Sequence, residues 1–328
     1  MNTKKKFQFN INTWLPIFVF VLIFVIFTIL TGGRLLSGRN LTNIFNQSVA
    51  TIIAAAGMMF VAAMGGTDIS TGVVVALAGT FGLMAADSSN SIVFILISIA
   101  IGIASGMLLG FVNAKLKVNS FMASLALMMA YRALVNLIVS NKSYYLPEDL
   151  EFLDNTLFKV IVVIVILLIV FYIWNYTRIG NYIRGIGENE VAIQHTGVNV
   201  VKMKIIAFTM SGLLAAIAGI FFVARNGGVS NTTGSGFEMK VMMALYIAGM
   251  PVAGGEGTRV YKLIFGAPTI IMLENGLTLC GLDAGVTQLV RGLVLLAAVC
   301  LSSQLANRMA YVGQSGAVNQ KAEAAREA

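Results

Sequence analysis

About ten mainly apolar runs, each close to the ~20 residues that an α-helix needs to cross a membrane, make up most of this chain. Hydrophobic residues account for 58% of the sequence and charged residues for 11%, whereas a soluble protein has about 25% charged residues. We therefore expect an all-α, polytopic membrane protein that forms one unit over 14–303, without a separate soluble domain. The apolar runs lie near 14–31, 44–64, 70–86, 91–112, 121–139, 158–175, 204–224, 237–253, 260–279 and 286–303.

The basic residues predict how these segments are oriented. The first run follows three lysines at 4–6, lacks an Ala-x-Ala cleavage pattern and precedes further spans, so we interpret it as a transmembrane helix. With the N-terminus in the cytoplasm, ten spans return the C-terminus to the cytoplasm, and most Lys and Arg residues then lie inside. The tails 1–13 and 304–328 are expected to be cytoplasmic. The acidic loop after Pro147 is expected outside, where it either contacts a partner or is simply solvated.

One polar segment stands out between two strongly apolar runs, at residues 180–204. Under this topology it belongs to a cytoplasmic loop at about 176–203. Its middle, 188–196, predicts a short helix, because two glutamates favour the start of a helix and Gly197 favours its end. Gly185 and Gly187 are expected to let the chain turn just before this helix.

Three segments in order resemble the membrane permeases of bacterial ABC importers of the ribose, galactose and arabinose type. The first is GGTDISTGVVVALAG at 65–79, and the second is TRIGNYIRGIGENEVAIQHTGVNVVKMKIIAFTMSGLLAAIAGIFFVAR at 177–225. The third is VAGGEGTRVYKLIFGA at 252–267, which is followed by ENGLTLCGL and QLVRGLVLLAAV. The resemblance covers most of residues 45–300 and implies a single transmembrane permease domain.

The resemblance implies a role for the polar loop as the coupling segment that docks into the ATP-binding subunit. The implied coupling residues are Gly187, Glu188, Asn189, Glu190, Ile193 and Gly197. It also implies a homodimer in the bacterial inner membrane, two ATP-binding cassette subunits on the cytoplasmic side and a solute-binding protein outside. The solute would be a small polar molecule, most simply a monosaccharide.

The chain lacks the residues that enzymatic chemistry needs. No P-loop pattern occurs, so ATP is expected to be bound by the partner subunit, and no cofactor is predicted for this chain. A single histidine, His195, and two distant cysteines, Cys280 and Cys300, assemble neither a catalytic centre nor a metal site. The positive charge of +8 is typical of cytoplasmic loops, so we expect contact with membrane lipid and none with nucleic acid.

Polar residues inside the apolar runs are candidates for the translocation path, because ionisable groups are costly in a membrane. The candidates are Asp68, Arg132, Asn136, Glu274, Asn275 and Gln288. Asp68 either faces a cavity at a broken helix or caps the third span. Glu274 either lines an outward vestibule or forms a structural ion pair with Arg132 or Arg291. The neutral groups suit sugar hydroxyls and interhelical hydrogen bonds equally well.

Two groups of glycines carry different predictions. A spacing of four residues places Gly102, Gly106 and Gly110 on one helix face, which favours close helix packing. The other group predicts hinges or helix breaks in the first and third resembling segments, the first of which contains Asp68. Its members are Gly65, Gly66, Gly72, Gly254 and Gly255.

Two other functions remain open on the sequence alone. One is an ion- or proton-coupled secondary transporter that uses Asp68 or Glu274 as the carrier carboxylate. The other is an ABC importer for a nucleoside or amino acid, because Glu274 and Asn275 stand where the resembling sugar permeases usually have paired asparagines. A membrane scaffold or an intramembrane enzyme would leave the polar loop without a purpose.

Overall fold

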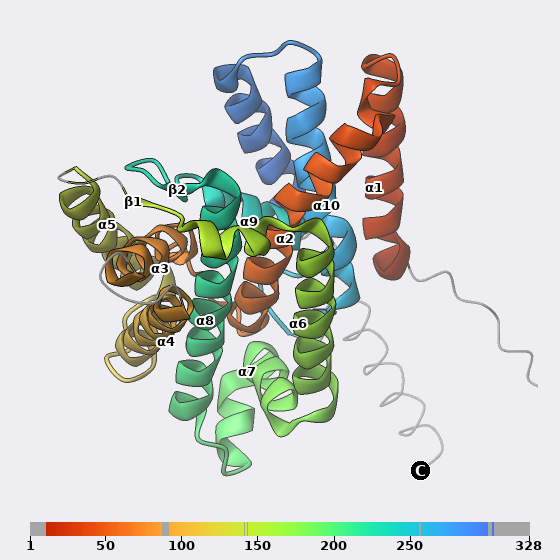
Figure 1. The fold of residues 1–328 in the computed structure, drawn as a ribbon. Coiled ribbons are helices and arrows are strands. Elements are labelled where there is room, and N and C mark those ends of the chain that lie inside the picture. The colour runs from red at the N-terminus through yellow and green to blue at the C-terminus, as the bar shows by residue number, and fades with distance from the viewer. Residues whose placement is uncertain are drawn as a thin grey trace, which may run out of the picture.

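The computed structural model describes residues 11–86, 92–140, 142, 144–255, 257–300 and 304. These residues are almost entirely helical, which confirms the all-α class (Figure 1). Of the predicted tails, only 11–13, which belong to the first helix, and Gln304 lie within the described residues. The elements are α1 (Ile11–Leu30), η1 (Arg34–Leu36), α2 (Gly38–Ala63), α3 (Thr71–Ala86), α4 (Ile92–Ala114), α5 (Ser120–Val139), β1 (Tyr144–Tyr145), η2 (Glu148–Asp154), α6 (Thr156–Tyr176), α7 (Arg178–His195), α8 (Val200–Asn226), β2 (Gly228–Val229), α9 (Phe237–Ile247), α10 (Tyr261–Leu279) and a last helix, Ala284–Cys300.

All ten predicted apolar runs coincide with a helix in whole or in part. Five helices are long and apolar enough to cross a membrane, namely α2, α4, α5, α6 and α8. Shorter apolar helices occupy Pro16–Leu30 within α1, α3 and the last helix. The all-α class can therefore be predicted from the composition, whereas the number of helices that cross the membrane completely cannot.

Asparagine side chains fix where three of the long helices begin. Asn119 accepts a hydrogen bond from the backbone N–H of Phe121 at the start of α5, and Asn155 does the same for Leu157 at the start of α6. Asn199 accepts from the N–H of Lys202 at the start of α8. Each amide oxygen satisfies one of the backbone donors that a helix leaves free in its first turn.

Two helices, α2 and α8, form the centre of the molecule. Every residue of α2 from Ser48 to Ala63 is buried. On the other side of α8, the glycine face of α4 lets the backbones touch: a Cβ on Gly106 would collide with the carbonyl oxygen of Phe208, and one on Gly110 would lie 2.9 Å from the Cα of Ile205. The predicted packing role of this glycine stripe is confirmed.

Two helices are too short to cross a membrane and begin near the middle of the molecule. α9 ends at Ile247 and has 11 residues, which is about 16 Å at 1.5 Å per residue, so the helix is shorter than the predicted span over 237–253. Before α3, the non-helical segment 64–70 runs along α8, where Asp68 bonds Ser211. Because Ser211 lies near the middle of the 27-residue α8, this break lies deep in the protein. Non-helical backbone at membrane depth has to be buried in protein, because lipid offers its N–H and C=O groups no hydrogen-bond partners.

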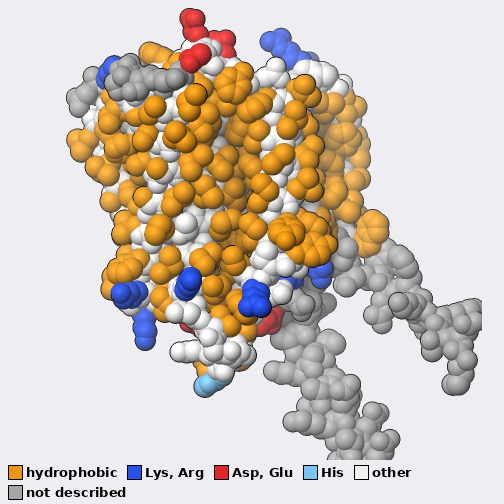
Figure 2. Space-filling model, turned by 60° about the horizontal axis from the view of Figure 1, so that its bottom comes forward, with side chains coloured by type: hydrophobic (Ala, Val, Ile, Leu, Met, Phe, Trp, Pro, Cys, Tyr) orange, Lys and Arg blue, Asp and Glu red, His pale blue; other side chains and the backbone are white. Residues whose placement is uncertain are grey.

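The two ends of the helical bundle differ in structure and in charge. α7 lies at one end, and the strands β1 and β2 lie at the other (Figure 1). The strands pair antiparallel, with Tyr144 opposite Val229 and Tyr145 opposite Gly228. In Figure 2, Lys and Arg side chains gather around the α7 end, whereas the most prominent acidic cluster lies at the opposite end, with further basic side chains beside it. Apolar side chains cover the surface between them, as expected for a face in contact with lipid.

Candidate functional site

The predicted coupling segment forms a bent helix, α7. Its backbone leaves helical geometry at Asn189, with φ −159° and ψ 99°, and the Asn189 side chain accepts a hydrogen bond of 3.0 Å from the N–H of Ala192. A second helical piece therefore follows Asn189 and ends at His195, before Gly197 with a positive φ of 83°. The short helix and its glycine stop agree with the sequence, but the turn does not lie at the predicted glycines.

Gly185 and Gly187 serve close packing instead of turning. Both lie inside the helical first half of α7. A Cβ on Gly187 would collide with the carbonyl oxygen of Ala63 at the end of α2, and one on Gly185 would meet Ile193. Ile193 thus folds back onto its own segment, and Val191, which is 61% exposed, is the apolar side chain that α7 presents to its surroundings.

The predicted helix breaks meet the coupling segment at one place, which we name the glycine junction and define as Ala63, Gly65, Gly187, Gly254 and Gly255. The N–H of Gly255 donates a hydrogen bond of 2.8 Å to the carbonyl oxygen of Ala63. A Cβ on Gly254 would lie 2.5 Å from that same oxygen and from the nitrogen of Gly65. Three segments far apart in sequence therefore touch through their backbones, at positions where no side chain fits.

Glu188 connects the coupling segment to the α9–α10 loop. A Cβ on Gly255 would collide with the Glu188 carboxylate, which shows how closely that group lies against the loop. On the other half of α7, both carboxylate oxygens of Glu190 lie 2.8 Å from the Nζ of Lys204 on α8. The two predicted glutamates thus hold the two halves of α7 against different elements, Glu188 against the α9–α10 loop and Glu190 against α8.

Two residues that the sequence did not single out hold the α9–α10 loop in place. The indole of Trp174 is fully buried, packs edge-on against Phe60 at 5.4 Å and donates to the carbonyl oxygen of Thr258 at 3.2 Å. The Nζ of Lys262 donates to the carbonyl oxygens of Gly249 and Gly257, at 2.8 and 3.1 Å. Trp174 lies near the end of one apolar run and Lys262 near the start of another, and neither position alone indicates these contacts.

Asp68 is buried and fully engaged with its own protein. One carboxylate oxygen accepts from the backbone N–H and the hydroxyl of Ser70, at 3.0 and 2.6 Å. The other accepts from the hydroxyl of Ser211 on α8, at 2.8 Å. The carboxylate therefore ties the segment before α3 to the middle of α8. The Asp68 side chain bonds Ser70, the residue just before α3. Asp68 therefore supports the start of the helix indirectly, through Ser70, and the capping interpretation holds only in this sense.

Glu274 forms ion pairs on both sides. Its carboxylate oxygens lie 2.6 Å from the Nζ of Lys240 on α9 and 2.6 Å from the Nη2 of Arg291 on the last helix. The neighbouring Asn275 accepts a hydrogen bond of 2.9 Å from the side chain of Asn40 on α2. The structure thus favours the ion-pair interpretation and adds Lys240, which sequence reasoning missed inside the predicted eighth span.

The remaining path candidates lie on α3, α5 and the last helix. Arg132 on α5 donates from its Nη1 to the carbonyl oxygen of Thr233, at 2.7 Å, and so supports the loop before α9. Asn136 and Gln288 are exposed on α5 and on the last helix. Gly72 lies in α3, where its backbone touches that of Gly234. Gly72 and Arg132 both lie near Glu238 of α9, which also interacts electrostatically with Arg291, the ion-pair partner of Glu274.

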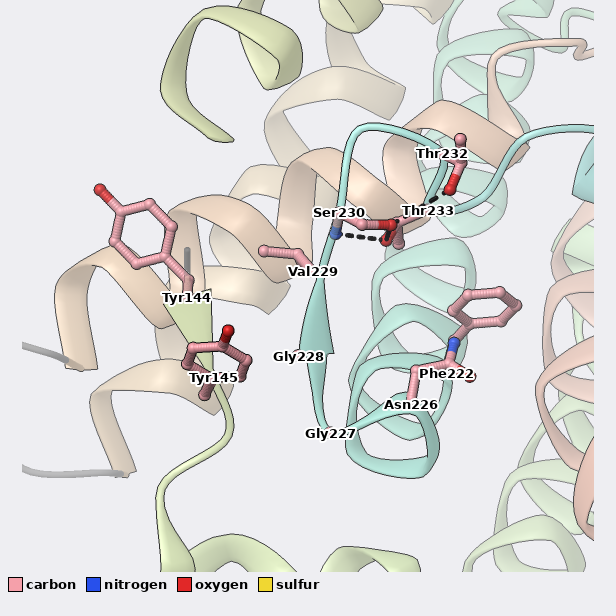
Figure 3. Close-up of a pocket in the computed structure, with 10 residues that line it drawn as sticks. All are labelled: Tyr144, Tyr145, Phe222, Asn226, Gly227, Gly228, Val229, Ser230, Thr232 and Thr233. Carbon is pink, nitrogen blue, oxygen red and sulfur yellow. Dashed lines mark hydrogen bonds between the residues drawn. The ribbon is translucent and has the colours of Figure 1, made fainter. Parts of the chain in front are cut away.

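A pocket of about 520 Å³ opens at the end of the molecule opposite α7 (Figure 3). It lies where β1, β2, the last turn of α8 and the loop before α9 come together. We name it the strand pocket. Its lining residues are Tyr144, Tyr145, Phe222, Asn226, Gly227, Gly228, Val229, Ser230, Thr232 and Thr233.

Known proteins are similar to this chain in sequence over most of its length. Residues 40–299 match the family described as the permease component of the branched-chain amino acid transport system. The chain belongs to this permease family. It is a multi-pass membrane subunit of a bacterial ABC importer, a transport subunit and not an enzyme. No solved structure matches the chain.

Three relatives illustrate the import systems in which similar permeases are found. The ribose import permease of Escherichia coli (strain K12) is 33% identical, over 81% of this chain and 86% of that protein. The fructose import permease of Rhizobium meliloti is 29% identical, over 87% and 84%. The autoinducer 2 import system permease of Photorhabdus luminescens is 29% identical, over 81% and 82%. Membership in this family agrees with the resemblance that the three sequence segments carried.

Proposed function

We propose that this permease forms the translocation path for a monosaccharide. The similarity to a ribose import permease over 86% of that protein is the observation that carries this proposal. The fructose import permease supports the same class of solute. The relative that belongs to an autoinducer 2 import system favours that molecule as a second candidate.

The α7 end of the permease is proposed to face the cytoplasm. Positive charge is the criterion, because cytoplasmic loops of membrane proteins carry an excess of Lys and Arg. The basic residues of the loops and helix ends on this side are Lys115, Lys117, Arg178, Arg184, Lys202, Lys204, Arg259 and Lys262. The opposite end carries the acidic η2 segment (Figure 2). The chain then crosses the membrane ten times, and two crossings combine a short helix, α3 or α9, with non-helical backbone.

ATP-driven movement is proposed to act on α7. The ATP-binding subunit would dock on the exposed half of α7 that carries Val191, while the first half rests on the glycine junction. Because backbone touches backbone there, with no side chain between to absorb movement, a shift of Gly187 displaces the end of α2 and the α9–α10 loop together. Short non-helical segments join these two places to α3, α9 and α10, so a small push would reach four helices.

A homodimer is proposed for the complete path, with a solute-binding protein at the end opposite α7. The exposed side chains of Asn136 and Gln288 support a protein partner on these faces. In lipid, an amide leaves its hydrogen-bonding groups unsatisfied, whereas a second copy of the chain offers partners.

The transport proposal is tested with the permease, its ATP-binding subunit and its solute-binding protein in proteoliposomes. Uptake of labelled D-ribose or D-fructose is expected to require ATP and to continue when ionophores collapse the ion gradients. Uptake that stops with the gradients and persists without the ATP-binding subunit would contradict it. Uptake of autoinducer 2 but of neither sugar would support the second candidate instead.

A further inference from the structure

Three cavities converge on the last turn of α8, residues 222–227. The first is the strand pocket. The second, of about 380 Å³, is lined by Leu146, Glu151, Asp154, Ala224, Arg225 and Gly227. The third is a crevice of about 60 Å³ between α2, α8, α9 and α10. Gly227 lines the first two, Arg225 the last two, and Phe222 and Asn226 the first and third. The three cavities therefore adjoin around this turn, and together we name them the hollow.

The lining of this hollow combines aromatic rings with uncharged hydrogen-bonding groups. Tyr145 is 76% exposed, and Phe222 lines the opposite wall (Figure 3). Asn226, Ser230 and Thr232 are exposed beside them. Aromatic faces offer apolar contact to the C–H bonds of a sugar ring. Hydroxyls and amides both donate and accept hydrogen bonds, as sugar hydroxyls do.

The hollow carries charged groups of both signs. The Nζ of Lys159, which is fully buried, lies 2.5 Å from one oxygen of Asp154, whose side chain stays 50% exposed. Arg225 donates to the amide oxygen of Asn43 at 2.8 Å. With carboxylates and a guanidinium on the same wall, the lining favours neither an anion nor a cation. A neutral polyhydroxylated molecule is the ligand that fits this balance.

Hydrogen bonds and close backbone packing fix the shape of the loop that forms one wall of the strand pocket. Arg132 bonds the carbonyl oxygens of Asn231 and Thr233. The hydroxyl of Thr233 accepts a hydrogen bond of 2.8 Å from the N–H of Ser230, and Gly228 fits against the carbonyl oxygen of Tyr144 without room for a side chain. The exposed hydroxyls therefore project from a fixed loop, which is the preorganisation that small-ligand sites show.

We propose that this hollow is an acceptor site in which a monosaccharide rests at the outer face of the permease before it moves inward. The site rests on the proposed function, since it names where this permease first holds its solute. The crevice leads from the site between the helices toward Lys240, whose Nζ pairs with Glu274. A route inward from the pocket thus passes the ion pairs of the protein interior.

The test uses the permease in complex with its ATP-binding subunit in lipid nanodiscs, without the solute-binding protein. Saturation-transfer NMR is recorded with D-ribose, D-fructose, D-galactose and L-arabinose. We expect transfer to at least one sugar, and about fivefold weaker binding in Asn226→Ala, the effect of losing one hydrogen bond. Tyr145→Ala is expected to weaken binding as well. Both side chains are exposed, so neither substitution disturbs the core. Tyr172→Ala on the exposed face of α6 is the matched control and should bind like wild type.

Absence of transfer to all four sugars, or transfer that Asn226→Ala and Tyr145→Ala leave unchanged, would overturn the acceptor site. ATP-driven sugar uptake, measured on the same preparation after reconstitution with the solute-binding protein, tests the transport proposal separately. A permease that transports a sugar but fails the binding test retains its proposed function and loses the acceptor site. Loss of binding in Tyr172→Ala to the same extent would also count against the site.

Discussion

The backbone N–H of Gly255 donates a hydrogen bond of 2.8 Å to the carbonyl oxygen of Ala63, which joins the α9–α10 loop to the end of α2. Gly187 lies against the same carbonyl, so the coupling segment is the third member of this contact. A permease driven by a separate ATP-binding subunit needs a rigid connection between the docking surface and its transmembrane helices. If the ATP-binding subunit docks on α7 as proposed, the glycine junction provides this connection, because direct backbone contact leaves no flexible side chain to absorb the movement.

Gly187→Ala is expected to damage both stability and transport. Its Cβ would collide with Ala63 and Gly255, and because both obstacles are backbone atoms, they cannot move aside as a side chain can. Overpacking of this kind costs about 1–3 kcal/mol of stability. A lower unfolding temperature in detergent and slower ATP-driven uptake should be seen together. Gly38→Ala is the control, since a Cβ there meets nothing within 4 Å; an unaffected Gly187→Ala variant would refute the close contact.

Val191→Asp is expected to prevent the ATP-binding subunit from co-purifying with the permease. Val191 is 61% exposed on the second half of α7, and a charge there would have to be buried without a partner in the docked complex. The permease itself should fold normally, because the side chain does not belong to its core. His195→Ala, on the same exposed piece, should keep the partner bound. Normal co-purification of Val191→Asp would place the docking surface elsewhere.

The helices could be predicted from the sequence more fully than their contacts. Long apolar runs identify membrane helices whatever their partners are, and the Gly102 to Gly110 stripe carries its packing role in its spacing. The end of α9 was missed because composition stays apolar to residue 253. Gly249, with a φ of +70°, and Pro251 after it were the local signals for the end of that helix.

The candidate site shows the same division. Glu188 and the glycine pairs could be singled out as unusual, but their meeting depends on how α2, α7 and α9 end in space, and no local pattern encodes that. Arg132 and Glu274 were correctly seen as residues that need partners. Arg291, one of the two predicted partners of Glu274, does pair with it. The other contacts, from Arg132 to a backbone carbonyl and from Glu274 to Lys240, join residues that are far apart in sequence and could not be predicted.

Glu274→Gln is expected to destabilise the permease by about 3 kcal/mol, because it leaves the buried ends of Lys240 and Arg291 without a counter-charge. Thermal unfolding in detergent measures the loss. Adding Lys240→Met removes one of the two unpaired charges, so the double variant should recover part of the stability. Glu148→Gln, at an exposed carboxylate, is the control and should unfold like wild type. Equal stability of Glu274→Gln and wild type would mean that the ion pairs contribute nothing.

Cysteine labelling tests the proposed orientation. In a background with Cys280→Ser and Cys300→Ser, Gln194→Cys should react with a membrane-impermeant maleimide only from the cytoplasmic side, because Gln194 is exposed on α7. Asn231→Cys should react only from the outside, since Asn231 is exposed in the loop before α9. Intact spheroplasts and inverted vesicles give the two sides separately. Labelling of both positions from one side would contradict the opposite placement of the two ends.

Asp68→Asn is expected to keep most of the transport activity, whereas Asp68→Ala should lose it. The carboxylate bonds Ser70 and Ser211, and an asparagine keeps an oxygen for the Ser70 donors and turns its amide toward the Ser211 hydroxyl, which can accept. Alanine leaves these buried groups unpaired, at a cost of about 1–3 kcal/mol for each. Uptake and unfolding temperature should therefore fall together in Asp68→Ala. A carboxylate that carried a proton would give the other pattern, in which Asp68→Asn folds normally but transports nothing, and that result would return Asp68 to the translocation path.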